Sequence, residues 1–420
     1  MTDKFSGRLD ELTSEQRALL EARIKKKGLS LSQSADPRER EPRHSANEYS
    51  SSGVGKRADL DRHIKFSLYF FSDDGSSSES GKYSLLLEGA RFADRNGFSA
   101  VWTPERHFQR FGGLYPNPSV LGAALAVTTE RVGIRAGSVA LPLHHPLRVA
   151  EEWSVVDNLS GGRVAVSFAS GWHPDDFIFA PEIYEKRKDV MFDYIDRIQR
   201  LWAGEEVMFE GINGSAMPLL SLPRPIQAAL PIWITTAGSA ATWAKAGEIG
   251  ANILCALVGY SYDDLAEHIG VYRKAREHNG HNPSTGQVTV MVHTYIGDDP
   301  DAVKAMVREP MYRYLRSYFQ QFTGVVHGGD IITEEDKMAI VARAFDSYYE
   351  DSLLIGTKRK CERVIDRLIE AGADELACLV DFGLDFDAVM QGLERLADLQ
   401  DEYARPRRSV ALAAPGTERE

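Results

Sequence analysis

The chain has 420 residues, 43% of them hydrophobic and 26% charged, which is enough for one large globular domain with tails. Its formal net charge of -12 repels phosphate backbones, so nucleic acid is excluded as an expected partner. Three cysteines without a Cys-x-x-Cys pair predict neither a disulfide framework nor a zinc site. There is neither a long apolar run to span a membrane nor a signal-peptide segment near Met1, so we expect a cytoplasmic protein.

Both ends of the chain differ in composition from the middle. A short amphipathic helix is predicted over 12–29, and a run rich in Ser, Pro, Arg and Glu follows from 30 to 55. That run has too little apolar surface to offset the entropy of ordering, so we read it as a flexible linker. The predicted organisation is an N-terminal helix and linker over 1–63, one domain over 64–402, and a disordered tail over 403–420.

Between the tails, short apolar runs alternate with longer amphipathic runs. The short runs are rich in Val, Ile, Phe and Ala without clean polar alternation, which is typical of strands buried on both faces of a parallel sheet. Strands are predicted over 64–71, 99–103, 132–140, 164–169, 232–236, 252–256, 288–296 and 375–380. Helices are predicted to begin near Gly81, Asn117, Pro146, Ile183, Ser239, Tyr262, Pro300 and Asp385.

Eight strand–helix units predict an α/β fold closed into a (β/α)8 barrel of the TIM type. An open doubly wound sheet is the alternative, but its Gly-x-Gly-x-x-Gly turn is absent after the first strand. Two stretches exceed the minimum barrel, a Gly- and Pro-rich one over 207–230 and a mostly helical one over 299–357. The second lies between strands seven and eight, with helices predicted over 302–322 and 333–349. We expect it to form a lid or wall of the site, with padding of the barrel exterior as the alternative.

Barrel enzymes carry their chemistry on the loops that follow the strands. After strand two, Glu105, Arg106 and His107 concentrate three ionisable groups, and we predict that they are catalytic. Histidine transfers protons near neutral pH, and a neighbouring carboxylate or guanidinium tunes its pKa. The alternative is a structural Glu–Arg pair beside a hydrogen-bonded histidine. After strand one, Phe70 and Phe71 could wall a planar ring, although core packing explains them equally well.

The loops after strands three and four suggest room for a flat cofactor. His144 and His145 are adjacent on an extended segment, so their side chains point to opposite sides and are not expected to share a metal ion. No His-Glu-x-x-His motif accompanies them. Small residues such as Ser170 and Gly171 let a cofactor approach the backbone, and Trp172 could flank it.

A phosphate site is predicted in the second half of the barrel. The turn Ala237-Gly238-Ser239 leads directly into a helix whose first N–H groups can hold a phosphate monoester. Arg187 opens an earlier helix and is a second candidate for the phosphate. The motifs of P-loop nucleotidases and of serine hydrolases are both absent.

Several motifs, in order, resemble those of the bacterial luciferase-like flavin monooxygenases. They are the run 97–108 (GFSAVWTPERHF), the run 141–152 (LPLHHPLRVAEE), the run 157–163 (DNLSGGR) and the turn 237–239 (AGS). The resemblance covers roughly 64–400. The run 171–177 (GWHPDDF) and the N-terminal run 12–20 (LTSEQRALL) resemble the subgroup associated with nonribosomal peptide and polyketide assembly lines.

The resemblance implies an enzyme that uses reduced FMN, supplied by a separate flavin reductase, and O2. It implies hydroxylation or Baeyer–Villiger oxygen insertion through a flavin C4a-peroxide, on a free small molecule or a carrier-protein-bound substrate. By the same resemblance, Ser138 and the run 170–172 would line the flavin ring, and the turn 237–239 with Arg187 would take the phosphate. A homodimer is expected.

The sequence departs from the family at one informative position. Where the family often has Glu-His-His after strand two, this chain has Glu105-Arg106-His107, which leaves His107 as the proton-transfer candidate and argues against light emission. Two other functions stay open. One is an oxidoreductase of the same fold that uses coenzyme F420, and the other is a non-catalytic barrel that serves as a megasynthase partner.

Overall fold

The computed structural model describes residues 63–71, 81–110, 112–171, 173–236, 238–257, 261–323 and 334–404. The predicted N-terminal helix, its linker and most of the predicted C-terminal tail lie outside these ranges. So do Trp172 and Ala237 of the predicted site. No helix in the described ranges has the length and apolar character needed to cross a bilayer.

A closed parallel barrel forms the centre of the molecule, as predicted. Its strands are β1 (Lys65–Tyr69), β2 (Ala100–Thr103), β3 (Gly133–Ala140), β4 (Val164–Ala169), β7 (Ile232–Thr236), β8 (Asn252–Ala256), β9 (Val288–Ile296) and β11 (Glu375–Leu379). They pair in this order, and β11 returns to β1 to close the ring. The predicted strands match these within two residues at each end, because each run is apolar on both faces.

Helices surround the barrel and bury an apolar layer against its outer face. They are α3 (Ser84–Arg95), α4 (Pro118–Thr128), α5 (Pro146–Ser160), α6 (Arg187–Ala203), α7 (Ala240–Glu248), α8 (Tyr262–His278), α11 (Lys358–Ala371) and α12 (Phe386–Ala404). Local chemistry fixes several of the ends. Asn117 caps α4 by accepting hydrogen bonds from the amides of Ser119 and Val120, and Ser261 forms a capping box with Asp264 at α8.

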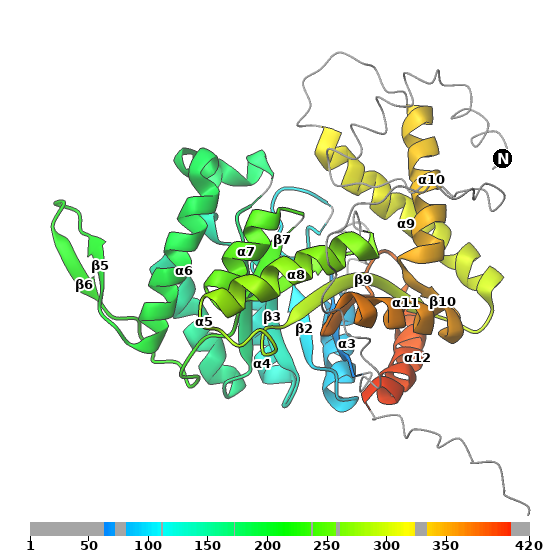
Figure 1. Cartoon of the computed structure of the whole chain (residues 1–420), viewed down its shortest axis with the longest axis horizontal. Helices are drawn as coiled ribbons and strands as arrows, with labels where there is room; N and C mark the ends of the chain where they lie inside the picture. Colours follow the sequence, from blue (N-terminus) through cyan, green and yellow to red (C-terminus); the bar gives the residue numbers. More distant parts are fainter. Residues whose placement is uncertain are drawn as a thin grey trace, which may run out of the picture.

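Other elements extend the barrel. The stretch 207–230 contains an antiparallel hairpin, β5 (Val207–Glu210) and β6 (Ala216–Leu219), which projects to one side in Figure 1. Short 3-10 helices η1 (Leu141–Leu143), η2 (Pro174–Phe179) and η3 (Pro181–Lys186) lie on the loops after β3 and β4. A short strand, β10 (Leu354–Gly356), pairs with β9 outside the ring.

The insertion after β9 consists of two long helices, α9 (Pro300–Thr323) and α10 (Glu334–Asp351), which lie together beyond the barrel on the side away from the hairpin (Figure 1). One face of α9, with Val303, Val307, Met311 and Leu315, packs in the same apolar cluster as side chains from the barrel interior. The insertion therefore covers part of the barrel opening, as expected of a wall of the site. The helix that crosses back to β11 is α11, which was not predicted as a separate element.

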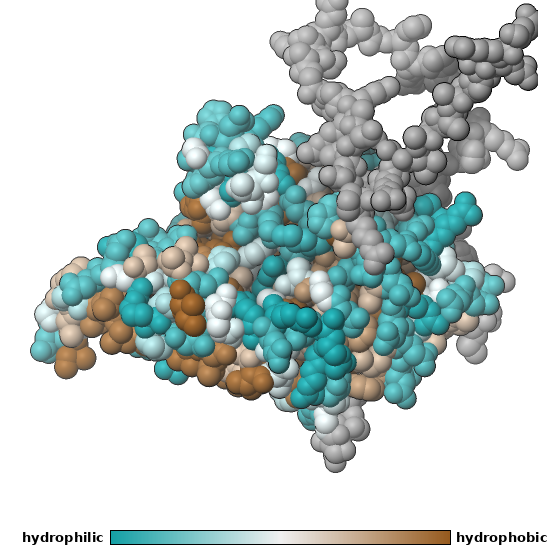
Figure 2. All heavy atoms as spheres, turned by 90° about the horizontal axis from the view of Figure 1, so that it is seen from below, coloured by the Kyte–Doolittle hydropathy of each residue, from teal (hydrophilic) through white to brown (hydrophobic). Residues whose placement is uncertain are grey.

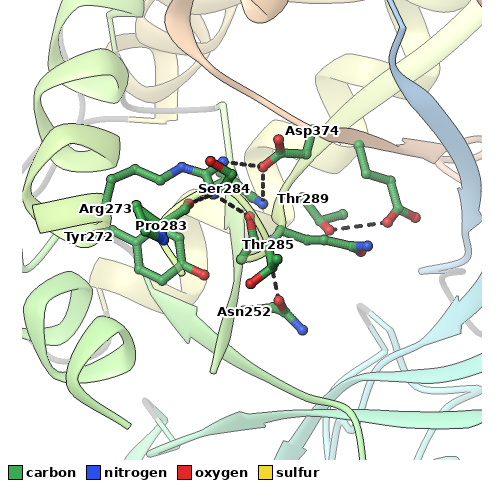
Figure 3. A network of polar contacts seen from close by, with 12 residues as sticks. Asn252, Tyr272, Arg273, Pro283, Ser284, Thr285, Thr289 and Asp374 are labelled. Atoms are coloured by element: carbon green, nitrogen blue, oxygen red, sulfur yellow. Dashed lines mark hydrogen bonds and ion pairs between the residues drawn. The ribbon is translucent and has the colours of Figure 1, made fainter. Parts of the chain in front are cut away.

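The N-terminal ends of the strands carry two ion pairs. Arg135 ion-pairs with Glu375 inside the barrel at 2.8 Å and lies between the rings of Trp102 and Trp233. Nearby, Arg273 pairs with Asp374 at 2.6 Å, as Figure 3 shows, and the same carboxylate accepts a hydrogen bond from the amide of Val288, the first residue of β9. These contacts hold the closed end of the barrel together.

The last helix runs slightly past the predicted end of the domain. It continues through Ala404, and Tyr403 is buried with its ring 6.2 Å from that of Phe66 on β1. The carbonyl of Tyr403 also contacts Nδ1 of His63 at 3.0 Å. The two ends of the described barrel are thus joined to each other.

Candidate active site

A buried carboxylate just beyond the C-terminal end of β2 bridges two histidines. Oε1 of Glu105 lies 2.8 Å from Nε2 of His107 and 2.6 Å from Nε2 of His144. Its other oxygen accepts a hydrogen bond from the amide of Ala140 at the end of β3. The Glu105 side chain is only 1% exposed, whereas those of His107 and His144 are 11% and 33% exposed. The cluster therefore connects a buried charge to the barrel opening.

Electrostatics keep this carboxylate ionised. Burial opposes ionisation, but the hydrogen bonds from His107 and His144 and the amide of Ala140 outweigh it and lower the pKa of Glu105. For His144, burial lowers the pKa, and the bond to Glu105 overcomes this so that the net shift is upward. An ionised carboxylate only accepts hydrogen bonds, so both Nε2 atoms carry hydrogen. The proton that each ring gains or loses is therefore the one on Nδ1.

Arg106 is buried beside this cluster on the same loop. Burial lowers its pKa, while the charge of Asp176 counteracts that effect. Asp176 comes from η2, after β4, and its own pKa is raised by burial against the influence of Arg106. The carboxylate of Glu105 faces the histidines and not Arg106, which speaks against the alternative of a structural Glu105–Arg106 pair.

Phe70 does not face the barrel opening, contrary to our expectation. Its ring packs outward against α3, where a side chain on Gly89 would come within 2.7 Å of it. Successive residues of a strand point to opposite faces, so Phe71 points inward instead. The Phe71 ring lies 6.3 Å from that of Tyr314 on α9 and 6.0 Å from the guanidinium of Arg106.

Hydroxyl groups line the ends of three neighbouring strands. Oγ1 of Thr235 on β7 lies 2.7 Å from Oγ of both Ser138 and Ser167, on β3 and β4. The Gly137–Ser138 peptide bond is cis, and the β3–β4 register shifts at this point. Ser170 and Gly171 follow directly after β4, and Gly171 has a φ of +72° that favours glycine.

Two helix N-termini open onto this side of the mouth. Gly238, with a φ of +121°, precedes Ser239, which is the N-cap residue of α7 but makes no side-chain capping bond. The first amides of α7 are thus available to an anion. Arg187 begins α6, and its Nε is buried without a hydrogen bond among the described residues. Because β4 and β7 are neighbours in the barrel, the loops carrying Arg187 and Gly238 lie on adjacent sectors.

The adjacent histidines diverge, as predicted. His144 turns to Glu105, whereas the ring of His145 lies 5.2 Å from that of Phe209 in the hairpin. Within the described ranges, no group of three or more His, Cys, Asp or Glu side chains is arranged to hold a metal ion.

Sequence reasoning missed three residues of this region. His144 was considered only as a metal ligand, and its partner is 39 positions away in the chain. For Thr235 and His293, the sequence indicated a place in a predicted strand but no role in the site. His293, on β9, is fully buried and faces Tyr314 of α9 at 4.4 Å between ring centroids.

Comparison with known proteins agrees with the geometry. The family model of luciferase-like monooxygenases matches residues 64–375. The oxygenase component of a flavin-dependent trigonelline monooxygenase from Acinetobacter baylyi is 26% identical, over 79% of this chain and 93% of that protein. A 4-hydroxyprotoasukamycin monooxygenase from Streptomyces nodosus subsp. asukaensis is 27% identical, over 78% of this chain and 87% of that protein.

Solved structures share the fold. The oxygenating constituent of 3,6-diketocamphane monooxygenase from Pseudomonas putida, in complex with FMN, superposes with a TM-score of 0.65 at 21% identity, covering 82% of this chain and all of that one. An F420-dependent secondary alcohol dehydrogenase superposes with a TM-score of 0.61 at 15% identity, covering 82% of this chain and 99% of that one. The family match spans most of the chain, so the protein belongs to the luciferase-like monooxygenases, and the prediction of a flavin-dependent monooxygenase is confirmed.

Proposed function

We propose that this protein is the oxygenase component of a two-component system that uses reduced FMN and O2. The observation that carries the proposal is the buried Glu105 with its two histidines at the mouth of the barrel. The oxygenase-component name of the trigonelline relative supports a separate flavin reductase as partner. The relative from the Streptomyces species supports a natural-product intermediate as substrate, either free or tethered to a carrier protein.

The residues present fit an FMN. Its phosphate would be held by the amides of Gly238, of Ser239 and of the first turn of α7, together with Arg187, whose buried Nε lacks a hydrogen bond among the described residues. The flavin ring would lie along the hydroxyl-lined strand ends near Ser138 and against Ser170 and Gly171. Trp172 and Ala237 stay in the proposed cofactor site as sequence predictions. Phe71 replaces Phe70 as the aromatic residue at the mouth.

Bound reduced FMN supplies the two electrons with which one oxygen atom of O2 enters the substrate and the other leaves as water. The chain's own residues manage protons and solvent. Glu105 fixes Nε2–H on His107 and His144, so each ring exchanges its proton at Nδ1. His144, with its raised pKa, is the proton store, and the less exposed His107 is the transferring group. Arg106 adds a buried positive charge that stabilises anionic oxygen nearby.

An apolar face supports the expected homodimer. Val120 and Val127 on α4 and Val155 and Leu159 on α5 are exposed, and the two helices pack side by side. Figure 2 shows further hydrophobic surface toward the hairpin end, where Met208 and Ile212 are exposed. Exposed apolar residues on two adjacent helices suit an isologous contact between two copies.

The function is tested with FMN alone. The chain is titrated with reduced FMN without oxygen, oxygen is admitted, and the flavin absorbance is followed for a transient that precedes oxidised FMN. We expect saturable binding and such a transient. His107→Gln should bind FMN normally, but the absorbance transient should have a shorter lifetime in this variant. Absence of both, with tight binding of coenzyme F420 instead, would favour the F420-dependent alternative. With isotopically labelled O2, a product whose mass exceeds that of the substrate by one labelled oxygen atom then shows that the inserted oxygen comes from O2.

A further inference from the structure

His293 is an ionisable residue in the barrel interior that the proposed proton transfer does not use. It lies on β9 between Val292 and Thr294, at the level of Leu379 on the neighbouring β11. The residues that precede it alternate, with Val290 and Val292 facing the helices and Met291 packing on the interior cluster. His293 therefore points inward, toward the covered half of the mouth.

Neither ring nitrogen of His293 has a hydrogen-bond partner among the described residues, although the residue is only 1% exposed. A buried imidazole without partners is destabilising, because the nitrogens lose their bonds to water and gain none in return. Burial lowers its pKa to about 3, so the ring is neutral and offers one N–H donor and one acceptor. An apolar residue would fill the same space at lower cost.

The walls around His293 are aromatic. The ring of Tyr314 on α9 lies edge-on at 4.4 Å, and that of Phe382 after β11 lies at 5.7 Å. The ring of Phe71 after β1 lies 6.3 Å from that of Tyr314. Tyr314 is half-buried and belongs to the insertion rather than to the barrel, so α9 supplies one wall of the space around His293.

We propose that His293 positions the substrate, and that the substrate is an aromatic compound with a hydroxyl group on its ring. The hydroxyl would donate to the nitrogen of the neutral His293 ring that carries no hydrogen, and the ring of the compound would take the place of Tyr314 beside Phe71 and Phe382. This inference rests on the proposed monooxygenase function, and it gives the wall formed by α9 a specific task.

The test compares 4-ethylphenol with 4-ethylanisole, in which a methyl group replaces the hydroxyl hydrogen so that the oxygen accepts but cannot donate, as ligands of the FMN-loaded chain. In the wild type we expect 4-ethylphenol to bind about tenfold more tightly than 4-ethylanisole, because the free energy of one hydrogen bond corresponds to about that ratio of dissociation constants. His293→Phe and His293→Leu should abolish this preference, and His293→Gln, with one donor and one acceptor, should restore part of it. Met291→Leu, on the same strand face, is the matched control and should keep the preference.

A second readout separates positioning from a structural role. His293→Phe or His293→Leu should raise the Tm of the ligand-free protein by about 1–4 °C, because an unsatisfied polar group is removed. FMN affinity should stay unchanged in these variants. A fall in Tm in both variants, or an unchanged phenol preference, would overturn the proposal. Failure of wild-type FMN binding would instead count against the proposed function.

Discussion

Replacing Glu105 by glutamine keeps the volume of the side chain and removes the charge that both histidines contact. The carboxylate accepts three hydrogen bonds in a site where its side chain is 1% exposed, so little solvent screening applies. An amide oxygen can keep the bond to Ala140, but its NH2 group then faces two ring nitrogens that carry hydrogen. From the loss of a buried charge partner we expect a decrease of about 3 kcal/mol in the free energy of unfolding at pH about 6.

The loss should depend on pH in a defined direction. The folded-state pKa of His144 is raised above its usual 6.5, so its contribution is present below that pH and is lost as the pH rises through the raised value. The pKa of Glu105 is lowered from 4.5, so its contribution is present above that pH and is lost as the pH falls through the lowered value. The difference in free energy of unfolding between wild type and Glu105→Gln should therefore be largest between the usual pKa values of the two groups, 4.5 and 6.5.

Urea unfolding across this range measures the difference, and NMR titration follows the His144 ring. In Glu105→Gln the pKa of His144 should fall below its usual value, because burial acts there without the carboxylate. Glu375→Gln is the matched control, since it removes a buried carboxylate from the opposite end of the barrel. It should destabilise the fold by about 3–5 kcal/mol and leave the His144 titration unchanged. An unaltered His144 pKa in Glu105→Gln would refute the reasoning.

Other perturbations follow from the same structure. Gly238→Ala places a side chain at a φ of +121°, so we expect FMN binding to weaken about tenfold by calorimetry, whereas Gly161→Ala, at a φ of +69° far from the mouth, should leave it unchanged. Gly89→Ala brings a methyl group within 2.7 Å of the Phe70 ring, and urea unfolding should show a loss of about 1–3 kcal/mol; an unchanged midpoint would contradict this packing. The pKa of His293 is lowered from 6.5 to about 3, so between these values only the unfolded chain binds this proton. The free energy of unfolding should therefore fall by about 1.4 kcal/mol for each pH unit that the pH drops within this range, and His293→Phe should reduce that slope.

Most of the barrel could be predicted because its strands are buried on both faces. Such strands appear in the sequence as short apolar runs, and β4 and β9 have the bounds that their runs indicate. The hairpin β5–β6 lacks this signal, since most of its residues are exposed and it contains a proline. The three-residue strand β10 is too short for any pattern to mark it.

The same property of the strands limited the prediction of the site. A strand that is apolar on both faces does not reveal which alternate residues point inward, so the sequence could not tell whether Phe70 or Phe71 lies at the mouth. Glu105 and His107 were found because three ionisable residues follow one strand. The contact of Glu105 with His144 depends on how the loops after β2 and β3 meet, and no local pattern encodes that.

The two ends of the barrel differ in how well their buried ionisable groups are satisfied. At the closed end, Arg135 forms two hydrogen bonds with Glu375, and Asp374 accepts from both Arg273 and the backbone of β9. At the mouth, Arg187 and His293 each keep buried nitrogen atoms without hydrogen bonds in the described part of the chain. Selection for stability alone would satisfy or remove such groups, because each one is costly. They lie at the end where barrel enzymes bind substrates, and the proposed ligands, an anion at Arg187 and a hydroxyl at His293, would supply the missing partners.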